Sequence, residues 1–578
     1  MWNILHDITD RSYKEEILPD LINEEVANKF NTFFSNVGMN VQKKLNINID
    51  KPTLNESGLF RFQPETKKQI EHLINRIKPN VATGCDQLSA KLIKIATPVI
   101  SEDLKNLVNL SYETKTFPDQ LKIAIVKPIH KKGDNNDPAQ YRPISILPIL
   151  SKIFERSAVD QLMDYIVKNG LLNKFQHAYQ KNHSTITCLF ELVERIKMNM
   201  DQNNMVAMAA LDLSKAFDSL AHNLILKKLV NIGLNDTATM WIDSYLKNRK
   251  QSVRLNKTIS DQQNVDSGVP QGSILGPLLF IITTNDISKA LEQYDISIYA
   301  DDMQILVKGK DLKHMQTTLE KAIKEANKYY NENSLLCNPT KTEVILFGTE
   351  KQLNKRTLEI YVEGENETKL LKGEKHIKIL GIYLDQHLNW TKQTSYVKQK
   401  ATNNIRMLHR INYCLPRKQQ RILYDSLVVP HFSYGDIIWM NCSQQNKNKL
   451  QLAQNFAAKS MVGAKKYDSA TALKTLQLIP LEQKRQIHLA VHVKKALEGH
   501  TTENISTMYK NQQNTNSSRA ATRGDLMYPK HRLELYSRGT FYSSIKIWNS
   551  LPQNLRNNNL NNFKIELQKH LVQNFINN

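Results

Sequence analysis

Two adjacent aspartates, Asp301 and Asp302, lie between two apolar segments of the chain. Residues 296–299 before them and 305–307 after them are rich in β-branched and aromatic side chains, which favour strands. We therefore expect a β-hairpin that carries both carboxylates. Neighbouring carboxylates repel each other and are costly to desolvate unless a cation neutralises them. Taken alone, the pair fits either a tight turn on a surface hairpin or a metal site.

A third acid, Asp212, lies in the otherwise apolar segment 206–213. Apolar residues on both faces predict a central, buried strand, and a helix with Ala216, Phe217 and Leu226 should follow it. An aspartate at the end of such a strand is a helix cap, an ion-pair partner or a ligand. If the strand end and the hairpin tip meet, three carboxylates would surround two hard cations, which prefer oxygen ligands.

Positive charge is concentrated in the last third of the chain. The 578 residues carry a net charge of +22, and residues 391–578 hold 28 Lys and Arg against 9 Asp and Glu. The preceding 390 residues hold 50 against 47, so this body is nearly neutral. Nucleic acid and anionic membrane surfaces are the usual partners of such an excess. Because the basic third also contains apolar segments such as 422–429, we expect a folded module that follows a phosphate backbone.

Length and cysteine content restrict the class of protein further. A chain of 578 residues is long enough for several domains. The five cysteines are scattered and form no CxxC pair, which excludes a zinc knuckle and argues against a disulfide framework. The first residues lack the pattern of a signal peptide, and no apolar stretch reaches the ~18 residues that span a bilayer. We expect a soluble intracellular protein, in the cytoplasm, the nucleus or both, with no membrane partner.

Seven sequence blocks follow one another between residues 80 and 385. They are 83–86, 129–134 with 141–145, 211–218, 268–277, 299–302, 338–342 and 379–382. In residue types and order they resemble the reverse transcriptases of non-LTR (LINE-type) retrotransposons, close to the jockey-like group. Two later blocks, 430–435 and 547–552, resemble the region that follows the polymerase in these elements. Each block alone is a weak signal, whereas seven in order are specific.

The resemblance implies an α+β fold: a right-hand polymerase with fingers and a palm built on an antiparallel sheet, followed by a mostly helical, basic thumb and C-terminal region. The implied division is 1–80 as a helical linker or N-terminal extension, 81–205 as fingers with the start of the palm, 206–390 as palm with the catalytic site, 391–510 as helical basic thumb, and 511–578 as a C-terminal region with a Trp-Asn-Ser-Leu-Pro block. About 80 residues precede the first block, too few for the endonuclease that such elements usually carry. We expect no endonuclease in this chain.

The resemblance also implies catalytic roles for several residues. Asp212, Asp301 and Asp302 would bind two Mg²⁺ ions, or Mn²⁺, that activate a primer 3′-hydroxyl and stabilise the leaving pyrophosphate. Lys341 matches the lysine proposed as general acid to the pyrophosphate, with an exposed lysine at a strand end as the alternative. Phe217 matches the bulky residue that excludes a ribose 2′-hydroxyl, with a core phenylalanine as the alternative.

Further matches concern the substrates. Arg142 and Lys131 match residues of the fingers that clamp the incoming triphosphate, Arg142 through its bidentate fork and Lys131 as a point charge. Lys132 is the alternative to Lys131. The remaining matches are Gln271 and Gly272, in the segment under the nucleotide and template base, and Gly381, in the primer-grip hairpin.

Two histidines lie in another stretch that resembles a family segment near the template, residues 175–185. His177 and His183 do not have metal-ligand spacing with a partner, so we expect both to be ordinary loop residues. Asp86 and Asp218 are expected to be structural or capping acids.

The sequence therefore predicts an RNA-directed DNA polymerase of a retrotransposon, which extends a primer 3′-hydroxyl with dNTPs by a two-metal mechanism. Its partners would be an RNA template, a DNA primer and dNTPs, with a separate endonuclease to supply the nick. The alternative is a nucleic-acid-binding protein derived from such an element whose site is no longer used. A polymerase of the telomerase-like or group II intron type is a third hypothesis, against which the two later blocks argue.

Overall fold

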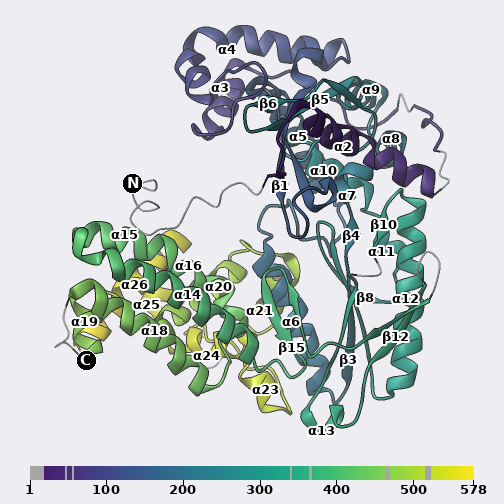
Figure 1. Cartoon of the computed structure of the whole chain (residues 1–578). Helices are drawn as coiled ribbons and strands as arrows, with labels where there is room; N and C mark the ends of the chain where they lie inside the picture. Colours follow the sequence, from purple (N-terminus) through teal and green to yellow (C-terminus); the bar gives the residue numbers. More distant parts are fainter. Residues whose placement is uncertain are drawn as a thin grey trace.

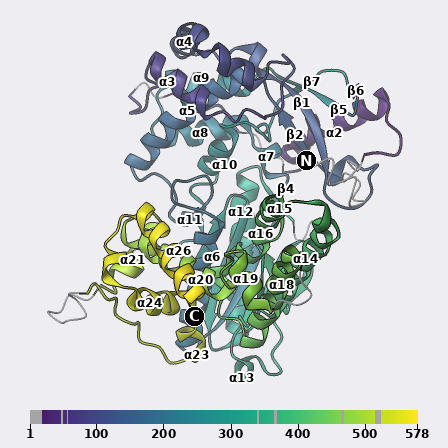
Figure 2. The same cartoon turned by 90° about the vertical axis from the view of Figure 1, so that its left-hand side faces the viewer.

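The structure is a computed structural model, and it describes residues 18–45, 49–54, 57–338, 341–363, 368–463, 468–513 and 523–577. Figure 1 shows an N-terminal lobe around α4 (Ala90–Glu113), a central body around β3 (Met205–Leu211) and α12 (Leu312–Glu332), and a group of C-terminal helices beside that body. In the view turned by 90°, the C-terminal helices lie in front of the central sheet and below the N-terminal lobe (Figure 2).

The N-terminal lobe contains a mixed sheet of five strands. In order these are β2 (Tyr141–Ile146), β1 (Ile123–His130), β5 (Arg249–Leu255) and β6 (Thr258–Ile259), and β7 (Gln263–Val265) also pairs with β5. β1 and β5 are parallel, and the other pairs are antiparallel. Because β5 to β7 follow β3 in the chain, two separate stretches of sequence build this lobe.

Helices surround the N-terminal sheet. α2 (Glu24–Lys44) packs against β5 and β7, and its Phe30 and Phe34 form a small core with Tyr141 and Val253. The other helices of the lobe are α3 (Lys67–Arg76), α4, α5 (Ile149–Lys168), α8 (His222–Asn231) and α9 (Asp236–Leu246). The residues of α2, far from β5 in sequence, are therefore part of the same packed unit as the sheet.

The central body is built on an antiparallel sheet of four strands. Their order is β11 (Glu343–Phe347), β3, β9 (Asp302–Gly309) and β8 (Asp295–Tyr299). Alternate side chains of β3 enter two different cores: Ala207 and Ala209 face α12 and α10 (Gly276–Thr283), whereas Val206 and Met208 face α6 (Thr185–Asp201) and the C-terminal helices. The predicted central, buried strand is confirmed.

Shorter elements complete the central body. β10 (Leu336–Cys337) pairs with β4 (Leu213–Ser214), and two hairpins follow: β12 (Glu359–Glu363) with β13 (Thr368–Lys372), and β14 (His376–Ile379) with β15 (Ile382–Asp385). The short helices are α7 (Ala216–Ser219), α11 (Ile287–Ala290) and α13 (Glu350–Leu353).

The single helix expected from residue 216 to residue 226 is wrong, because the chain forms α7 and α8 with a break at Leu220 and Ala221. The backbone carbonyls of Phe217 and Leu220 accept hydrogen bonds from the N–H groups of Val269 and Gly268, at 2.9 and 2.8 Å. These long-range bonds occupy the carbonyl groups that a continuous helix would use for its own ladder.

The C-terminal region is mostly helical in the residues described. Its helices are α14 (Thr391–Ile411), α15 (Arg417–Leu427), α16 (Val429–Ser433), α17 (Asp436–Trp439), α18 (Gln444–Val462), α19 (Ser469–Thr475), α20 (Leu481–Leu497), α21 (Glu503–Lys510), α23 (Glu534–Ser537), α24 (Thr540–Ser550), α25 (Gln553–Arg556) and α26 (Leu560–Asn577). They share one hydrophobic core with α6 and one face of the central sheet. The predicted fold class, an antiparallel sheet with helices followed by a mostly helical region, is confirmed. Among the described helices, none combines the length and apolarity needed to cross a membrane.

Candidate active site

The β8–β9 hairpin carries the two adjacent aspartates at its tip. Tyr299 pairs with Asp302, so Ala300 and Asp301 form the turn between the strands. Ala300 has φ +56°, a left-handed conformation that costs a residue with a side chain about 1 kcal/mol or more. The surrounding contacts must therefore hold the turn, and the hairpin predicted from the flanking residues is confirmed.

The end of β3 lies opposite this tip. Leu211 pairs with Met303 in the antiparallel register, which places Asp212 beside Asp302, one residue further on each strand. Both aspartates line a cavity of about 110 Å³, which Lys341 and Lys378 also line. The structure therefore brings together the three acids that the sequence pointed out separately.

Electrostatics at the tip reflects the crowding of these carboxylates. Burial, followed by the charges of Asp301 and Asp212, raises the pKa of Asp302 to about 6. Burial also raises the pKa of Asp301; Asp212 adds to this effect, and Arg142 and Lys131 oppose it. Such a set of oxygen donors, whose negative charges repel one another, suits a hard divalent cation.

The carboxylates do not form a preformed cage. Among the described residues, no group of three or more His, Cys, Asp and Glu side chains is arranged closely enough to hold a metal ion. The positive neighbour of Asp212 is instead Lys341, whose Nζ lies 2.9 Å from Asp212 Oδ2. The donor types fit divalent cations, and closure of the three oxygens around an ion requires side-chain movement.

Lys341 is positioned by a turn that is bonded to the strand end itself. The Asn338 N–H donates to the Asp212 carbonyl at 2.8 Å, and the Lys341 N–H donates to the Asn338 carbonyl at 3.1 Å. β10, just before this turn, pairs with β4, just after Asp212. Pro339 and Thr340 of the same block lie outside the described residues. Lys341 is thus more than an isolated surface lysine, because its backbone is tied to the acid that its side chain contacts.

Two basic residues of the N-terminal lobe face the acids. Arg142 is exposed on β2, and Lys131 directly follows β1, with its N–H bonded to the Gln140 carbonyl at 2.8 Å. Loss of hydration, together with the charges of Arg142 and Lys341, lowers the pKa of Lys131. The charges of Asp212 and Asp218 also act on Lys131, so this side chain, which the sequence left open against Lys132, lies near the acids.

Residues 268–272 pack between β2 of the N-terminal lobe and α7 of the central body. The Gln271 carbonyl accepts the Ser145 N–H of β2 at 2.7 Å. A Cβ on Gly272, at φ +134°, would lie 2.3 Å from the Ser145 carbonyl oxygen, so only glycine permits this approach. The Gln271 Nε2 donates to both carboxylate oxygens of Asp218 at 2.8 Å. Burial raises the pKa of Asp218 to about 6, a shift that Gln271 partly offsets.

Phe217 lies on α7, five residues after Asp212. Its half-buried ring stacks on Phe280, with centroids 4.7 Å apart. Packing therefore fixes one face of the ring while part of the side chain remains accessible, and the exclusion of a 2′-hydroxyl by Phe217 stays a prediction.

The turn between β14 and β15 contains Leu380 and Gly381, at φ +45° and +87°. The Tyr434 hydroxyl donates to the Leu380 carbonyl at 2.6 Å. A Cβ on Gly381 would lie 3.2 Å from the Tyr434 ring. The missing side chain at Gly381 thus accommodates a residue of the C-terminal region, in addition to the left-handed backbone.

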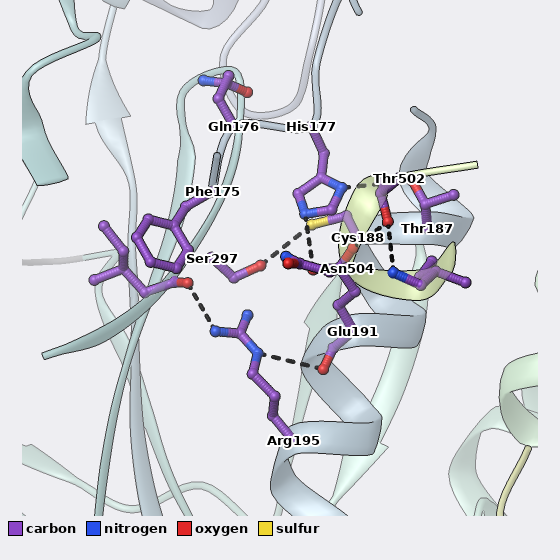
Figure 3. Close-up of polar contacts among 12 residues, drawn as sticks. Phe175, Gln176, His177, Thr187, Cys188, Glu191, Arg195, Ser297, Thr502 and Asn504 are labelled. Carbon is purple, nitrogen blue, oxygen red and sulfur yellow. Dashed lines mark hydrogen bonds and ion pairs between the residues drawn. The ribbon is translucent and has the colours of Figure 1, made fainter. Parts of the chain in front are cut away.

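Sequence reasoning missed a group of polar residues behind the hairpin. Gln176 is buried, and its Oε1 accepts the Ala300 N–H at 2.9 Å. His177 lies in a loop, as expected, but it is 2% exposed and lies beside Glu191 and Thr187, as Figure 3 shows. The partner of Gln176 is 124 residues away in the chain, so no local pattern signals its contact with the hairpin.

Comparison with known proteins agrees with this geometry. Residues 129–384 match the sequence profile of the family described as reverse transcriptase (RNA-dependent DNA polymerase). These residues are a reverse transcriptase domain. They contain the acidic hairpin, the end of β3 and both basic residues of the N-terminal lobe that face them.

Relatives of the reverse transcriptase domain occur in mobile elements of Drosophila melanogaster. The chain is 27% identical to a probable RNA-directed DNA polymerase from transposon BS, 26% identical to one from transposon X-element, and 24% identical to the RNA-directed DNA polymerase from mobile element jockey. The matches cover 75, 71 and 70% of this chain and 49, 45 and 44% of the relatives. The chain thus spans about half the length of these relatives.

A solved structure of telomerase from Candida albicans, in complex with the TWJ fragment of telomeric RNA, is 12% identical with a TM-score of 0.33. The match covers 70% of this chain and 68% of that chain.

Proposed function

We propose that this chain is an RNA-directed DNA polymerase, which extends the 3′-hydroxyl of a DNA primer with dNTPs along an RNA template. The observation that carries the proposal is the meeting of Asp212 with the Asp301-Asp302 hairpin at one end of the central sheet. The reverse transcriptase domain around these acids and the printed names of the relatives support the same activity.

In the proposed site, Asp212, Asp301 and Asp302 hold two Mg²⁺ or Mn²⁺ ions. When bound, such ions supply Lewis acidity toward the primer hydroxyl and the leaving pyrophosphate. The raised pKa of Asp302 supports this assignment, because a carboxylate crowded by like charges gains most from a neighbouring cation. Lys341 exchanges its contact with Asp212 for the pyrophosphate oxygens and donates a proton to them.

The remaining residues of the site bind and select the nucleotide. Arg142 and Lys131 bind the triphosphate, and their charges already act on the hairpin tip. Phe217 blocks the space of a ribose 2′-hydroxyl. Gly272 keeps the segment under the nucleotide close to β2, and Gln271 orients Asp218 beneath it.

The parts of the fold take corresponding roles in this proposal. The N-terminal lobe, which is built from segments on both sides of β3, acts as fingers, the central body as palm and the helices after residue 391 as thumb. The basic C-terminal helices hold the template–primer duplex, and Gly381 lies at the primer.

Primer extension tests the proposal. Purified protein is given a DNA primer annealed to an RNA template, dNTPs and Mg²⁺, beside a variant with Asp301→Ala and Asp302→Ala. We expect the variant to incorporate at least about 1,000-fold less dNTP, because loss of the cation ligands removes several kcal/mol of transition-state stabilisation. Asp295→Asn, at the opposite end of β8, is the matched control and should keep most of its activity.

Binding of the same duplex is measured in parallel by fluorescence anisotropy. If wild type and the double variant incorporate equally little dNTP while both bind the duplex, the protein binds nucleic acid without polymerising it. That result would contradict the proposed activity.

A further inference from the structure

Residues 175–178, which we call the hairpin clasp, run alongside β8 as an additional short edge. The His177 N–H donates to the Ile298 carbonyl at 2.9 Å, and the Ile298 N–H donates to the Phe175 carbonyl at 3.0 Å. Gln176 and Ile298 thus form a parallel bridge outside the four-stranded sheet. The clasp is therefore hydrogen-bonded to the catalytic hairpin two residues before its turn.

The side chain of Gln176 continues this contact into the turn. Its Oε1 accepts the N–H of Ala300 and the N–H of Ala178, both at 2.9 Å. Gln176 is 4% exposed, so water cannot readily replace this oxygen. Removal of Oε1 would leave two buried N–H groups without an acceptor, an arrangement that folded proteins avoid.

The bonded N–H belongs to the strained residue of the hairpin. Ala300 has φ +56°, and Asp301 and Asp302 follow it directly. A change at Ala300 toward an ordinary backbone conformation would redirect both carboxylates. Gln176 Oε1 thus accepts the N–H group at the start of the turn that carries both carboxylates.

A buried carboxylate beside the clasp is hydrogen-bonded to the C-terminal region. Glu191 of α6 accepts hydrogen bonds from the Thr502 hydroxyl at 2.5 Å and from Asn504 Nδ2 at 3.0 Å. His177 Nε2 lies 3.8 Å from Glu191 Oε2. Figure 3 shows His177 near Thr502, the N-cap residue of α21, and near Asn504 of α21. The C-terminal region thus reaches the side chain of His177 in the clasp through one buried carboxylate, at a separation longer than a hydrogen bond.

We propose that Gln176 is a positioning residue for the catalytic hairpin: it holds Ala300 in its left-handed conformation and thereby directs Asp301 and Asp302 toward Asp212. The inference rests on the proposed function for its catalytic meaning, but the positioning itself is measurable without catalysis.

Hydrogen exchange and metal binding test the inference on the full chain. Gln176→Leu keeps the size of the side chain and removes the acceptor. We expect the Ala300 amide to exchange at least tenfold faster, and Mn²⁺, titrated by electron paramagnetic resonance, to bind at least fivefold more weakly. Gln176→Glu restores an acceptor of the same reach, and we expect it to restore protection of the Ala300 amide.

Gln420→Leu is the matched control for loss of stability. Gln420 is also a buried glutamine whose side chain makes two hydrogen bonds with the backbone, to the carbonyls of Asn412 and Leu415, but it lies in the C-terminal helices. We expect this variant to leave Ala300 exchange and Mn²⁺ affinity at the wild-type values. If it changes them as much as Gln176→Leu does, the effect is general loosening and the inference is wrong.

The inference is also overturned if folded Gln176→Leu keeps wild-type Ala300 exchange and Mn²⁺ affinity. Should Gln176→Leu fail to fold, Gln176→Asn, which withdraws the oxygen by one methylene, is measured in its place against the same criteria. Absence of primer extension by wild type would contradict the proposed function alone, because neither readout requires turnover.

Discussion

Phe217 shows how one side chain is shared between the core and the site. Its ring stacks on Phe280, and the carbonyl of the same residue accepts the Val269 N–H at 2.9 Å. Packing therefore supports one face of the ring, and the hydrogen bond fixes the backbone of the same residue. A side chain that discriminates by volume needs such support, because a mobile ring would move away from the group that it excludes.

We predict that Phe217→Ala lowers the preference for dNTPs over rNTPs by about 10–100-fold, since a steric pocket distinguishes one small group by about 1–3 kcal/mol. The measurement is the ratio of kcat/KM for dGTP and GTP in single-nucleotide extension. Phe280→Leu loosens the support of Phe217 but keeps the Phe217 ring itself, so it should lower the preference for dNTPs less. Unchanged discrimination by Phe217→Ala would mean that the residue serves only the core.

At the scale of elements, sequence reasoning succeeded where the signal is local. The β8–β9 hairpin follows from apolar strands on both sides of Asp301, and burial of β3 follows from its composition. The prediction of a single helix after Asp212 was wrong because the interruption of that helix depends on Gly268 and Val269, some fifty residues away. Gln176 and Glu191 were missed for the same reason: their partners are 124 and 311 residues distant in the chain.

The β14–β15 turn connects the central body to the C-terminal helices. Its two residues, Leu380 and Gly381, both have positive φ, the combination of a tight hairpin turn that suits glycine. Tyr434 closes over this turn and donates to the Leu380 carbonyl. A change at the turn therefore affects the hairpin and the position of the helical region together.

We predict that Gly381→Ala weakens binding of the template–primer duplex about tenfold and destabilises the protein by about 1–2 kcal/mol, because a side chain is strained at φ +87° and meets the Tyr434 ring. Gly463→Ala is the matched control: Gly463 has φ +75° and open space around it. The control should lose similar stability in thermal unfolding but bind the duplex like wild type in fluorescence anisotropy. Equal loss of binding by both variants would remove the specific role of the turn.

At the scale of the whole molecule, net charge alone overstates the surface that can bind nucleic acid. Arg485, Lys494 and Arg556 of the C-terminal region are 2, 9 and 6% exposed. They make internal contacts, among them an ion pair between Arg556 and Asp525. α14 is different: it holds five Lys and Arg and no acidic residue, and its apolar residues face the core. Its solvent face therefore concentrates the accessible charge, next to the β14–β15 hairpin.

We predict that a double variant with Lys398→Ala and Lys400→Ala, both exposed on α14, reduces the salt dependence of duplex binding. Each lysine that neutralises a phosphate releases about one counterion, so the slope of log K against log salt should decrease in magnitude by about 2. Duplex affinity is measured at salt concentrations between about 50 and 300 mM, the range in which the salt dependence of binding is large. The control is a double variant with Lys67→Ala and Lys68→Ala, both exposed on α3 of the N-terminal lobe, which should leave the slope unchanged. An unchanged slope in the α14 variant, with a reduced slope in the control, would place the duplex on the N-terminal lobe instead.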